Sequence, residues 1–505
     1  MIVSLLSRAA RLLAGIIFIA AFAYPMVALV LACVTAAEDP TAPWAPSGRQ
    51  WGLLGRSCWL AAAATLACIT VALPAALVVA HHARGIGQAL FTAAALGCLL
   101  CPPMVYSFGW DRLLPAGVHP HLRCIAVWAM WAWPIPAWLI AAGWRRGGRQ
   151  AYEAALLDAP QVRALIVAAR PALMRYVVLS AFVLFVLFFC DYGVPHACGL
   201  IVFATELLGL ASNSPHPADA VLPALPVLAL TTGMLAMVAM LYRRSAIQEA
   251  GDIESAGGAV AAATVIAWVV LLLGSALPMG ALAARLSAWS AVPAAWRTYN
   301  LDLVWSFCVA ASAGVVSVVM GWCLLHRTFL CRGGVGISVL FGALPGAVTG
   351  AALVAAYNRP AFAWVYDHWP IVLLSYVTHY GWVGMLAAAA AAPWRRSEVI
   401  RQAQLDGADA AAALDRVVLP LHWPVLLAGA GMVAVLSLGD VAACSLVRVP
   451  GYAPLAHVLI EKFHRFEDDM LISLSLTVVV ATGVTALLCT CLLRIWRSRP
   501  LRDAT

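Results

Sequence analysis

The chain alternates between long apolar runs and short polar segments from its first residues to its last. A run of about 20 apolar residues can cross the hydrocarbon core of a bilayer as a helix. The pattern therefore predicts an all-α membrane protein with about 12 transmembrane helices, because a helix satisfies its own backbone hydrogen bonds in lipid. The predicted spans cover residues 12–35, 57–80, 88–110, 122–143, 172–195, 219–242, 259–286, 301–326, 333–356, 371–393, 424–447 and 470–493. The first of them is expected to persist as a membrane anchor, since it is too long for a signal peptide.

The spans divide into two sets of six that resemble each other. Ser57 begins one span and Ser306 begins another, and Asp191 and Asp440 end two apolar runs at the same separation. The longest polar loop of each set follows its fourth span. We therefore expect two homologous halves, residues 1–247 and 259–505, with the acidic and glycine-containing segment 248–258 as a cytoplasmic linker.

Composition excludes a large soluble domain. Hydrophobic residues make up 64% of the chain and charged residues 11%, whereas soluble domains carry about 25% charged residues. The net charge of +8 comes almost wholly from arginine, since Lys462 is the only lysine. In so apolar a chain this excess indicates loops at the membrane surface and not a nucleic-acid partner.

The arginines indicate how the chain is oriented. They gather in the loops after the even-numbered spans, and cytoplasmic loops are enriched in arginine and lysine. Arg145, Arg146, Arg149, Arg163, Arg170 and Arg175 lie after the fourth span, and Arg395, Arg396, Arg401 and Arg416 lie after the tenth. Both termini and both long loops are therefore predicted to lie in the cytoplasm.

Each of these two loops contains a predicted short helix with a leucine-aspartate pair near its end. The pairs are Leu157-Asp158 and Leu405-Asp406, and Gly407 follows the second in a position that suits a left-handed turn. Such a helix either lies at the membrane surface without a partner or docks on a cytoplasmic protein. Its presence at matched positions in both halves favours docking.

The two loops resemble the E-A-A-x-x-x-G-A signature of the membrane permeases of binding-protein-dependent ABC importers. In that family the loop forms a coupling helix that docks on the ATP-hydrolysing subunit. The resemblance places the docking positions at Glu153, Ala154, Ala155, Asp158, Ala159, Pro160, Arg401, Gln402, Ala403, Asp406, Gly407 and Ala408. Four of them depart from the signature, namely Ala159, Pro160, Arg401 and Gln402.

Other segments resemble fused, double-length permeases for iron(III) and thiamine. They are Ala343–Gly350, Tyr357–Pro360 and Cys190–Pro195. The resemblance implies a pathway for a small solute, with iron(III) as the first cargo and thiamine or another small organic solute as alternatives. The candidate pathway residues are Asp191, Tyr192, Tyr357, Asn358 and Asp440. The alternative for the two aspartates is a helix-end carboxylate at the lipid headgroups.

No enzymatic site is evident in the sequence. Lys462 follows no glycine-rich loop, so the chain lacks a P-loop. The resemblance therefore implies separate partners: two copies of a cytoplasmic ATPase that uses the ATP, and a periplasmic or lipoprotein solute-binding protein, at a bacterial inner membrane. No cofactor or metal is expected to bind this chain, and His119 and His121 beside Pro120 suit a turn better than a metal site. The remaining alternatives are an ion-gradient-driven secondary transporter and a membrane scaffold.

Overall fold

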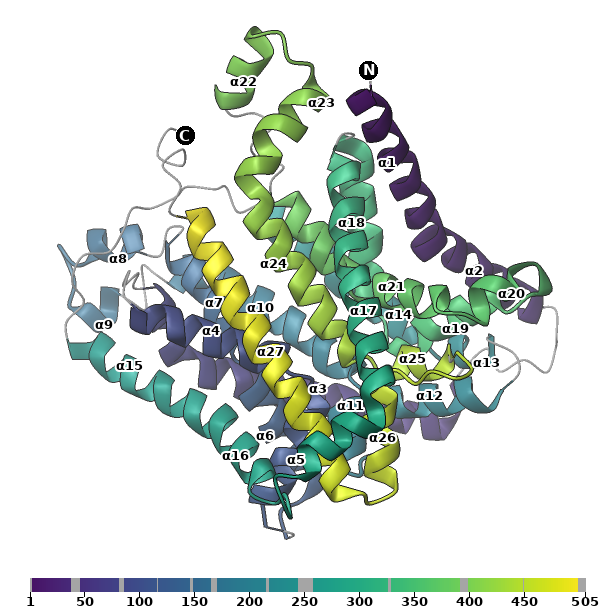
Figure 1. The fold of residues 1–505 in the computed structure, drawn as a ribbon. Coiled ribbons are helices and arrows are strands. Elements are labelled where there is room, and N and C mark those ends of the chain that lie inside the picture. The colour runs from purple at the N-terminus through teal and green to yellow at the C-terminus, as the bar shows by residue number, and fades with distance from the viewer. Residues whose placement is uncertain are drawn as a thin grey trace.

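The computed structural model describes residues 2–37, 46–80, 86–115, 117–145, 149–164, 170–214, 218–243, 258–325, 328–390, 398–447 and 449–497. These residues form helices and no strand (Figure 1). Up to Arg243 the helices are α1 (Ile2–Phe18), η1 (Ile19–Ala23), α2 (Tyr24–Ala37), α3 (Gly48–Ala80), α4 (Ile86–Leu100), α5 (Pro103–Leu113), α6 (Pro120–Ala132), α7 (Pro134–Gly143), α8 (Arg149–Ala155), α9 (Gln161–Ala164), α10 (Arg170–Cys190), α11 (Gly193–Ala197), α12 (Phe203–Asn213), α13 (Ala218–Val221) and α14 (Leu225–Arg243). From Gly258 on they are α15 (Gly258–Leu271), η4 (Leu272–Ala276), α16 (Leu277–Ala283), α17 (Ala291–Leu325), α18 (Thr328–Gly342), α19 (Gly346–Tyr357), η5 (Pro360–Phe362), α20 (Ala363–Tyr366), α21 (Pro370–Ala389), α22 (Glu398–Leu405), α23 (Ala410–Ala413), η7 (Leu414–Val418), α24 (Leu419–Leu438), α25 (Ala442–Leu446), α26 (Leu455–His464) and α27 (Asp468–Arg497).

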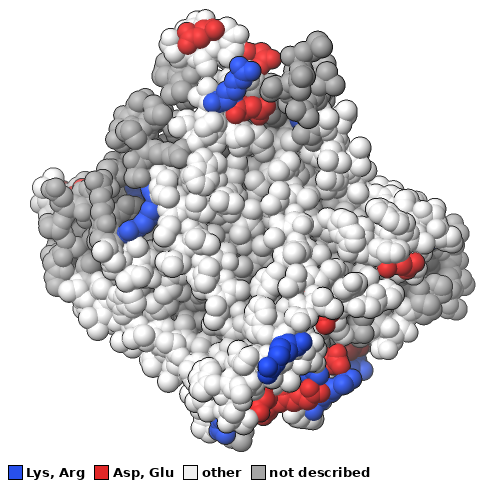
Figure 2. Space-filling view, viewed as in Figure 1, with Lys and Arg blue, Asp and Glu red and all other residues white. Residues whose placement is uncertain are grey.

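The helices make a multi-pass membrane protein. Among the described residues eight helices are long and apolar enough to cross a membrane, or up to eleven if each bent pair counts as one span. The predicted span 219–242 corresponds to α14, whose apolar part, Leu225–Met237, is shorter than the others. Figure 2 shows a wide uncharged surface between charged side chains at the top and at the bottom of the molecule.

Three of the predicted spans are bent. The axis turns by 96° between α4 and α5, by 49° between α6 and α7, and by 114° between Gly333–Gly342 and α19. Pro102 and Pro103, Pro134, and Pro345 stand at the three breaks, and proline ends a helix because it lacks the backbone N–H and its ring clashes with the preceding turn. The predicted single helices 88–110, 122–143 and 333–356 are therefore wrong in shape, although each run is helical on both sides of its break.

The helices can be taken in two parts, those up to Arg243 and those from Gly258 on. The first helices of each part pack on helices of the other part. Helix α1 packs on α17 and α2 packs on α19, while α15 packs on α3 and α16 packs on α5. A π-helical turn interrupts each crossing helix, at η1 and at η4. The Tyr357 hydroxyl donates to the carbonyl of Ala20 in η1 at 2.8 Å, and the Tyr106 hydroxyl lies 2.7 Å from the Ser275 hydroxyl in η4. A tyrosine hydroxyl from a bent helix thus contacts each turn, at a backbone carbonyl in η1 and at a side-chain hydroxyl in η4.

The long helices α3 and α17 hold later segments of the chain in the same way. The Ser57 hydroxyl of α3 accepts a hydrogen bond from the backbone N–H of Phe203 at 2.9 Å, where α12 begins. The Ser306 hydroxyl of α17 accepts one from the backbone N–H of Leu455 at 3.0 Å, where α26 begins. Both serines are buried. The predicted linker 248–258 lies outside the described residues except for Gly258.

Small residues allow the three long helices α17, α21 and α24 to pack closely. A Cβ atom on Gly314 of α17 would lie 2.2 Å from the carbonyl oxygen of Ala430 in α24. A Cβ on Gly384 of α21 would lie 2.8 Å from the Cβ of Ser317. In lipid, helices associate through van der Waals contact and not through water exclusion, so small residues at the crossing bring backbones together. The seam around Gly314 therefore fixes the three helices relative to one another.

Candidate functional site

The end of α10 contacts the bend before α19, and the end of α24 contacts the bend between α4 and α5. The Cys190 thiol at the end of α10 donates to the carbonyl oxygen of Ala343, at the bend before α19, at 3.3 Å. Gly439 at the end of α24 packs on Pro102, at the bend between α4 and α5, so closely that an added Cβ would lie 2.9 Å from the proline ring. We call residues 101–104, 190–194, 343–346 and 439–443 the central junction. It brings Asp191 and Asp440 into one region.

Asp191 uses its carboxylate to start a short helix. Its oxygens accept hydrogen bonds from the indole N–H of Trp128 at 2.7 Å and from the backbone N–H groups of Gly193 at 3.0 Å and Val194 at 3.2 Å. The last two are among the donors that a helix start leaves without intrahelical partners. Asp191 thereby ties the end of α10 to α6 and sets the direction of α11.

Asp440 likewise accepts a hydrogen bond from the first turn of a short helix, and its side chain is buried. Its side chain is only 2% exposed, so protein groups enclose it. One oxygen lies 3.3 Å from Nδ1 of His379 on α21, and the other accepts from the backbone N–H of Ala443 at 3.3 Å. Buried polar groups need such partners because an unpaired one is costly in a low dielectric. The carboxylate and the imidazole thus hold each other between α21 and α25.

Replacing Asp440 with leucine is expected to lower the free energy of unfolding by about 1–3 kcal/mol, because His379 and the Ala443 N–H lose a buried acceptor. Asp440→Asn keeps an oxygen for that N–H and should lose less. Thermal unfolding of the detergent-solubilised protein measures both, with the exposed Asp367→Leu as control. A melting temperature of Asp440→Leu equal to that of the control would contradict the assigned contacts.

A pocket of about 530 Å³ adjoins the central junction. Tyr192 and Val441, the residues directly after the two aspartates, both line it. The other lining residues are Leu208, Ser212, Ser445, His457, Ile460, Glu461, His464 and Arg465. A smaller pocket of about 310 Å³ shares His457 and Glu461 with it and extends to Asp302 and Tyr452. The walls are α12 on one side and α25 and α26 on the other, so both parts of the chain contribute.

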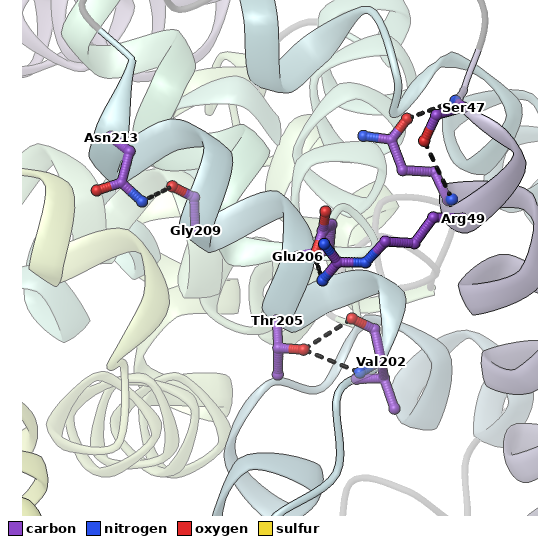
Figure 3. Close-up of polar contacts among 8 residues, drawn as sticks. Ser47, Arg49, Val202, Thr205, Glu206, Gly209 and Asn213 are labelled. Carbon is purple, nitrogen blue, oxygen red and sulfur yellow. Dashed lines mark hydrogen bonds and ion pairs between the residues drawn. The ribbon is translucent and has the colours of Figure 1, made fainter.

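Helix α12 is fixed at its start by polar contacts (Figure 3). The Thr205 hydroxyl accepts from the backbone N–H of Val202 at 2.9 Å and donates to the Val202 carbonyl at 2.7 Å. Glu206 pairs with Arg49 of α3 at 3.1 Å. The arginine is well exposed, and exposed pairs contribute at most about 1 kcal/mol, so the turn at Val202 is the firmer anchor of this pocket wall.

A histidine pair links α11 to α26 beside the pocket. The Nε2 atoms of His196 on α11 and His464 on α26 lie 3.0 Å apart. The Tyr192 ring stacks on His196 with 4.9 Å between ring centroids. Burial, and then the neighbouring His464, lower the pKa of His196. Neither His196 nor His379 could be predicted from the sequence, because each acquires its partner only through the folding of distant segments.

Of the other predicted pathway residues, only Tyr192 lines the pocket. Tyr357 is 4% exposed and its hydroxyl contacts η1, as described above. Asn358 is exposed at the end of α19. The structure therefore brings Asp191, Tyr192 and Asp440 together and places Tyr357 and Asn358 elsewhere, next to the crossing helix.

The predicted cytoplasmic helices are present as α8 and α22. In Figure 1 they lie at the left and at the top, on the side where α1 begins and α27 ends, whereas α12 and α26 lie toward the lower right. Glu153, Ala154, Asp158 and Pro160 around α8 are exposed, as are Arg401, Gln402, Asp406 and Gly407 around α22, and Ala155, Ala159, Ala403 and Ala408 are half-buried. Leu157 is 86% exposed and Leu405 is 80% exposed. Two matched leucines therefore project from short helices with no apolar cover.

Helix α22 ends as its sequence predicts and rests on the long helices. Gly407 has a φ of +90°, and the N–H of Ala408 donates to the carbonyl of Ala403 at 2.9 Å, which closes the helix. On its inner face Ile400 is 4% exposed and packs in a cluster that contains Trp322 of α17 and Leu426 of α24. A displacement of α22 would thus be felt by α17 and α24.

Comparison with known proteins identifies part of the chain. Residues 313–499 match the family described as binding-protein-dependent transport system inner membrane component. This match covers less than half of the chain and supports a permease of a binding-protein-dependent ABC transporter, a membrane transport component and not an enzyme. No curated protein and no solved structure matches the chain.

Proposed function

We propose that this chain is the permease subunit of an ATP-driven ABC importer and forms the translocation pathway for a small solute. The observation that carries the proposal is the family match over residues 313–499, which includes α22 and the end of α24 with Asp440. The matched family implies an ATPase and a solute-binding protein as partners. Two copies of the ATPase would bind this chain, one at each short helix.

Two homologous halves, residues 1–247 and 259–505, would supply the pathway between them. Several matched features support this division: the bent pairs α4–α5 and α18–α19, the π-helical turns η1 and η4, and the serine anchors at Ser57 and Ser306. The pocket between α12 and α26 would be the outer mouth, where the binding protein delivers the solute. Both termini would then lie in the cytoplasm of a bacterial cell, with the chain in the inner membrane.

The coupling helices would be α8 and α22. Each presents an exposed leucine followed by an aspartate, at Leu157-Asp158 and Leu405-Asp406. Covering an exposed apolar side chain with a partner protein removes it from water, which lowers the free energy of the complex. Closure of two ATPase copies would draw α8 and α22 together, and the contact of Ile400 with the long helices would carry the movement to the central junction.

Iron(III) is the first cargo to test, with thiamine and other small organic solutes next, on the resemblance of Cys190–Pro195 and Ala343–Gly350 to permeases for those solutes. Among the described residues no group of three or more histidine, cysteine or carboxylate side chains could hold a metal ion. The binding protein would therefore carry the selectivity for the cargo, and the pathway would only release it across the membrane.

The buried Asp440–His379 pair also suits a different class of protein. Ionisable groups within a membrane occur in the proton relays of secondary transporters. Such a transporter would need no ATPase, and its uptake would collapse with the proton gradient. Energy source is thus the property that separates the two classes.

Reconstitution in liposomes with a partner ATPase and a solute-binding protein tests the proposal. We expect the ATPase to co-purify, and uptake to require ATP inside the liposomes and to survive a protonophore. Gly407→Arg, which puts a bulky side chain at a positive φ on the docking surface, should abolish uptake. Uptake that continues without ATP, or in the Gly407→Arg variant, would contradict the importer assignment.

A further inference from the structure

The nitrogen separation in the pair formed by His196 and His464 would suit a bound metal ion as well as a shared proton. Two Zn–N bonds of about 2.0–2.1 Å, set at an angle between a right angle and the tetrahedral angle, separate the nitrogens by about 2.9–3.4 Å. The Nε2 atoms of His196 and His464 are 3.0 Å apart. The separation that allows a shared hydrogen bond therefore also allows both nitrogens to bind one metal ion.

The two rings come from segments that are far apart in sequence and meet edge-on at an interplanar angle of 88°, and packing holds the His196 ring in place. Tyr192 stacks on His196 at an interplanar angle of 19°. The Phe463 ring lies 6.3 Å from the His196 ring, and it is itself stacked on Phe108 of α5 at 5.1 Å. A ligand whose rotamer is fixed by packing loses little entropy on binding a metal. The His196 ring is therefore preorganised.

The surroundings leave room for an ion and do not repel it strongly. His464 lines the open pocket of about 530 Å³, so water can complete the coordination sphere. Glu461 lines the same pocket, and Arg465 is paired with Glu461 at 2.9 Å, which offsets its positive charge.

We propose that His196 and His464 form a two-histidine site for a divalent transition-metal ion such as Zn²⁺, and that the bound ion links α11 to α26 beside the pocket. Imidazole nitrogen suits zinc, copper and nickel. Iron(III) prefers oxygen ligands, so this site would differ in chemistry from a site for iron(III). A bound ion would therefore resist the separation of α11 from α26. The inference rests on the pair itself and stands whether or not the transporter uses ATP.

Calorimetric titration of Zn²⁺ into the full-length protein in lipid nanodiscs tests the site. We expect one binding event that weakens at least tenfold in His196→Phe and in His464→Phe. Phenylalanine keeps a ring for the stack with Tyr192 but has no lone pair, so folding should be preserved. Zn²⁺ should also raise the melting temperature of the unchanged protein and of neither variant.

A second histidine pair on the chain supplies the matched control. His119 and His121 lie with their Nδ1 atoms 3.1 Å apart, but both sit on one exposed turn and bridge nothing. In the variant that carries both His119→Phe and His121→Phe, the zinc-dependent rise in melting temperature should persist. The proposal is overturned if Zn²⁺ binding is unchanged in His196→Phe and His464→Phe, or if only the control variant loses it.

Discussion

Replacing Leu157 or Leu405 with alanine is expected to weaken the binding of the cytoplasmic ATPase by tenfold or more. The two side chains are 86% and 80% exposed in the isolated subunit. Covering a leucine side chain contributes about 1.5–3 kcal/mol, and about 1.4 kcal/mol corresponds to a factor of ten in affinity. In the double variant both docking sites should weaken by about tenfold or more, since each leucine would meet its own copy of the ATPase. Surface plasmon resonance with the immobilised permease measures the change.

The control for these variants is a similarly exposed, larger apolar residue far from α8 and α22. Phe466 is 88% exposed beyond α26, next to the outer pocket, and Phe466→Ala should leave ATPase binding unchanged. All three variants should melt at the temperature of the unchanged protein, because none of these side chains packs within the fold. If Leu157→Ala and Leu405→Ala bind the ATPase as well as Phe466→Ala does, α8 and α22 are not the docking helices.

The apolar pattern predicted where the helices run better than it predicted their shape. Hydropathy gave the long helices α3, α10, α17, α21 and α27 because each is one continuous apolar run. It could not show the bends after Leu100 and Gly342, because the arms on both sides of each bend are apolar. The prolines at 102, 103 and 345 were the local signal. The crossing of α1 and α15 onto opposite parts of the chain is a matter of tertiary packing, which no local pattern encodes.

The candidate site was predicted in part. The matched positions of Asp191 and Asp440 and the left-handed residue Gly407 could be read from the chain, because a repeat and a glycine after a helix are local signals. Trp128 and His379, which partner the two aspartates, could not be read in this way. Each lies on another helix, and the hydrogen bond exists only once that helix is in place. The predicted role of Tyr357 in a pathway stays a prediction, and its hydroxyl contacts η1.

Replacing Gly314 with valine is expected to lower the free energy of unfolding by about 3 kcal/mol or more. The Cβ of any other residue would lie 2.2 Å from the carbonyl oxygen of Ala430 and 2.9 Å from the carbonyl carbon. Overpacking usually costs about 1–3 kcal/mol, and here the obstacle is backbone, which no side-chain rotation relieves. Helices α17 and α24 would have to separate, and the contacts of α21 with both would loosen. Chemical denaturation in mixed micelles, followed by tryptophan fluorescence, measures the loss.

Gly336→Val is the matched control for this substitution. Gly336 is a helical glycine of α18, and nothing lies within 4 Å of the Cβ position there, so valine at that site should leave stability nearly unchanged. Gly314→Ala should fall between the two, because it adds the clashing Cβ atom without the two methyl groups that enlarge it. If Gly314→Val and Gly336→Val unfold at the same denaturant concentration, the close approach of α17 and α24 is not what holds the three long helices together. If the predicted order is found, the seam is a rigid unit, and a pull on α22 must then move α17, α21 and α24 as one body toward or away from the central junction.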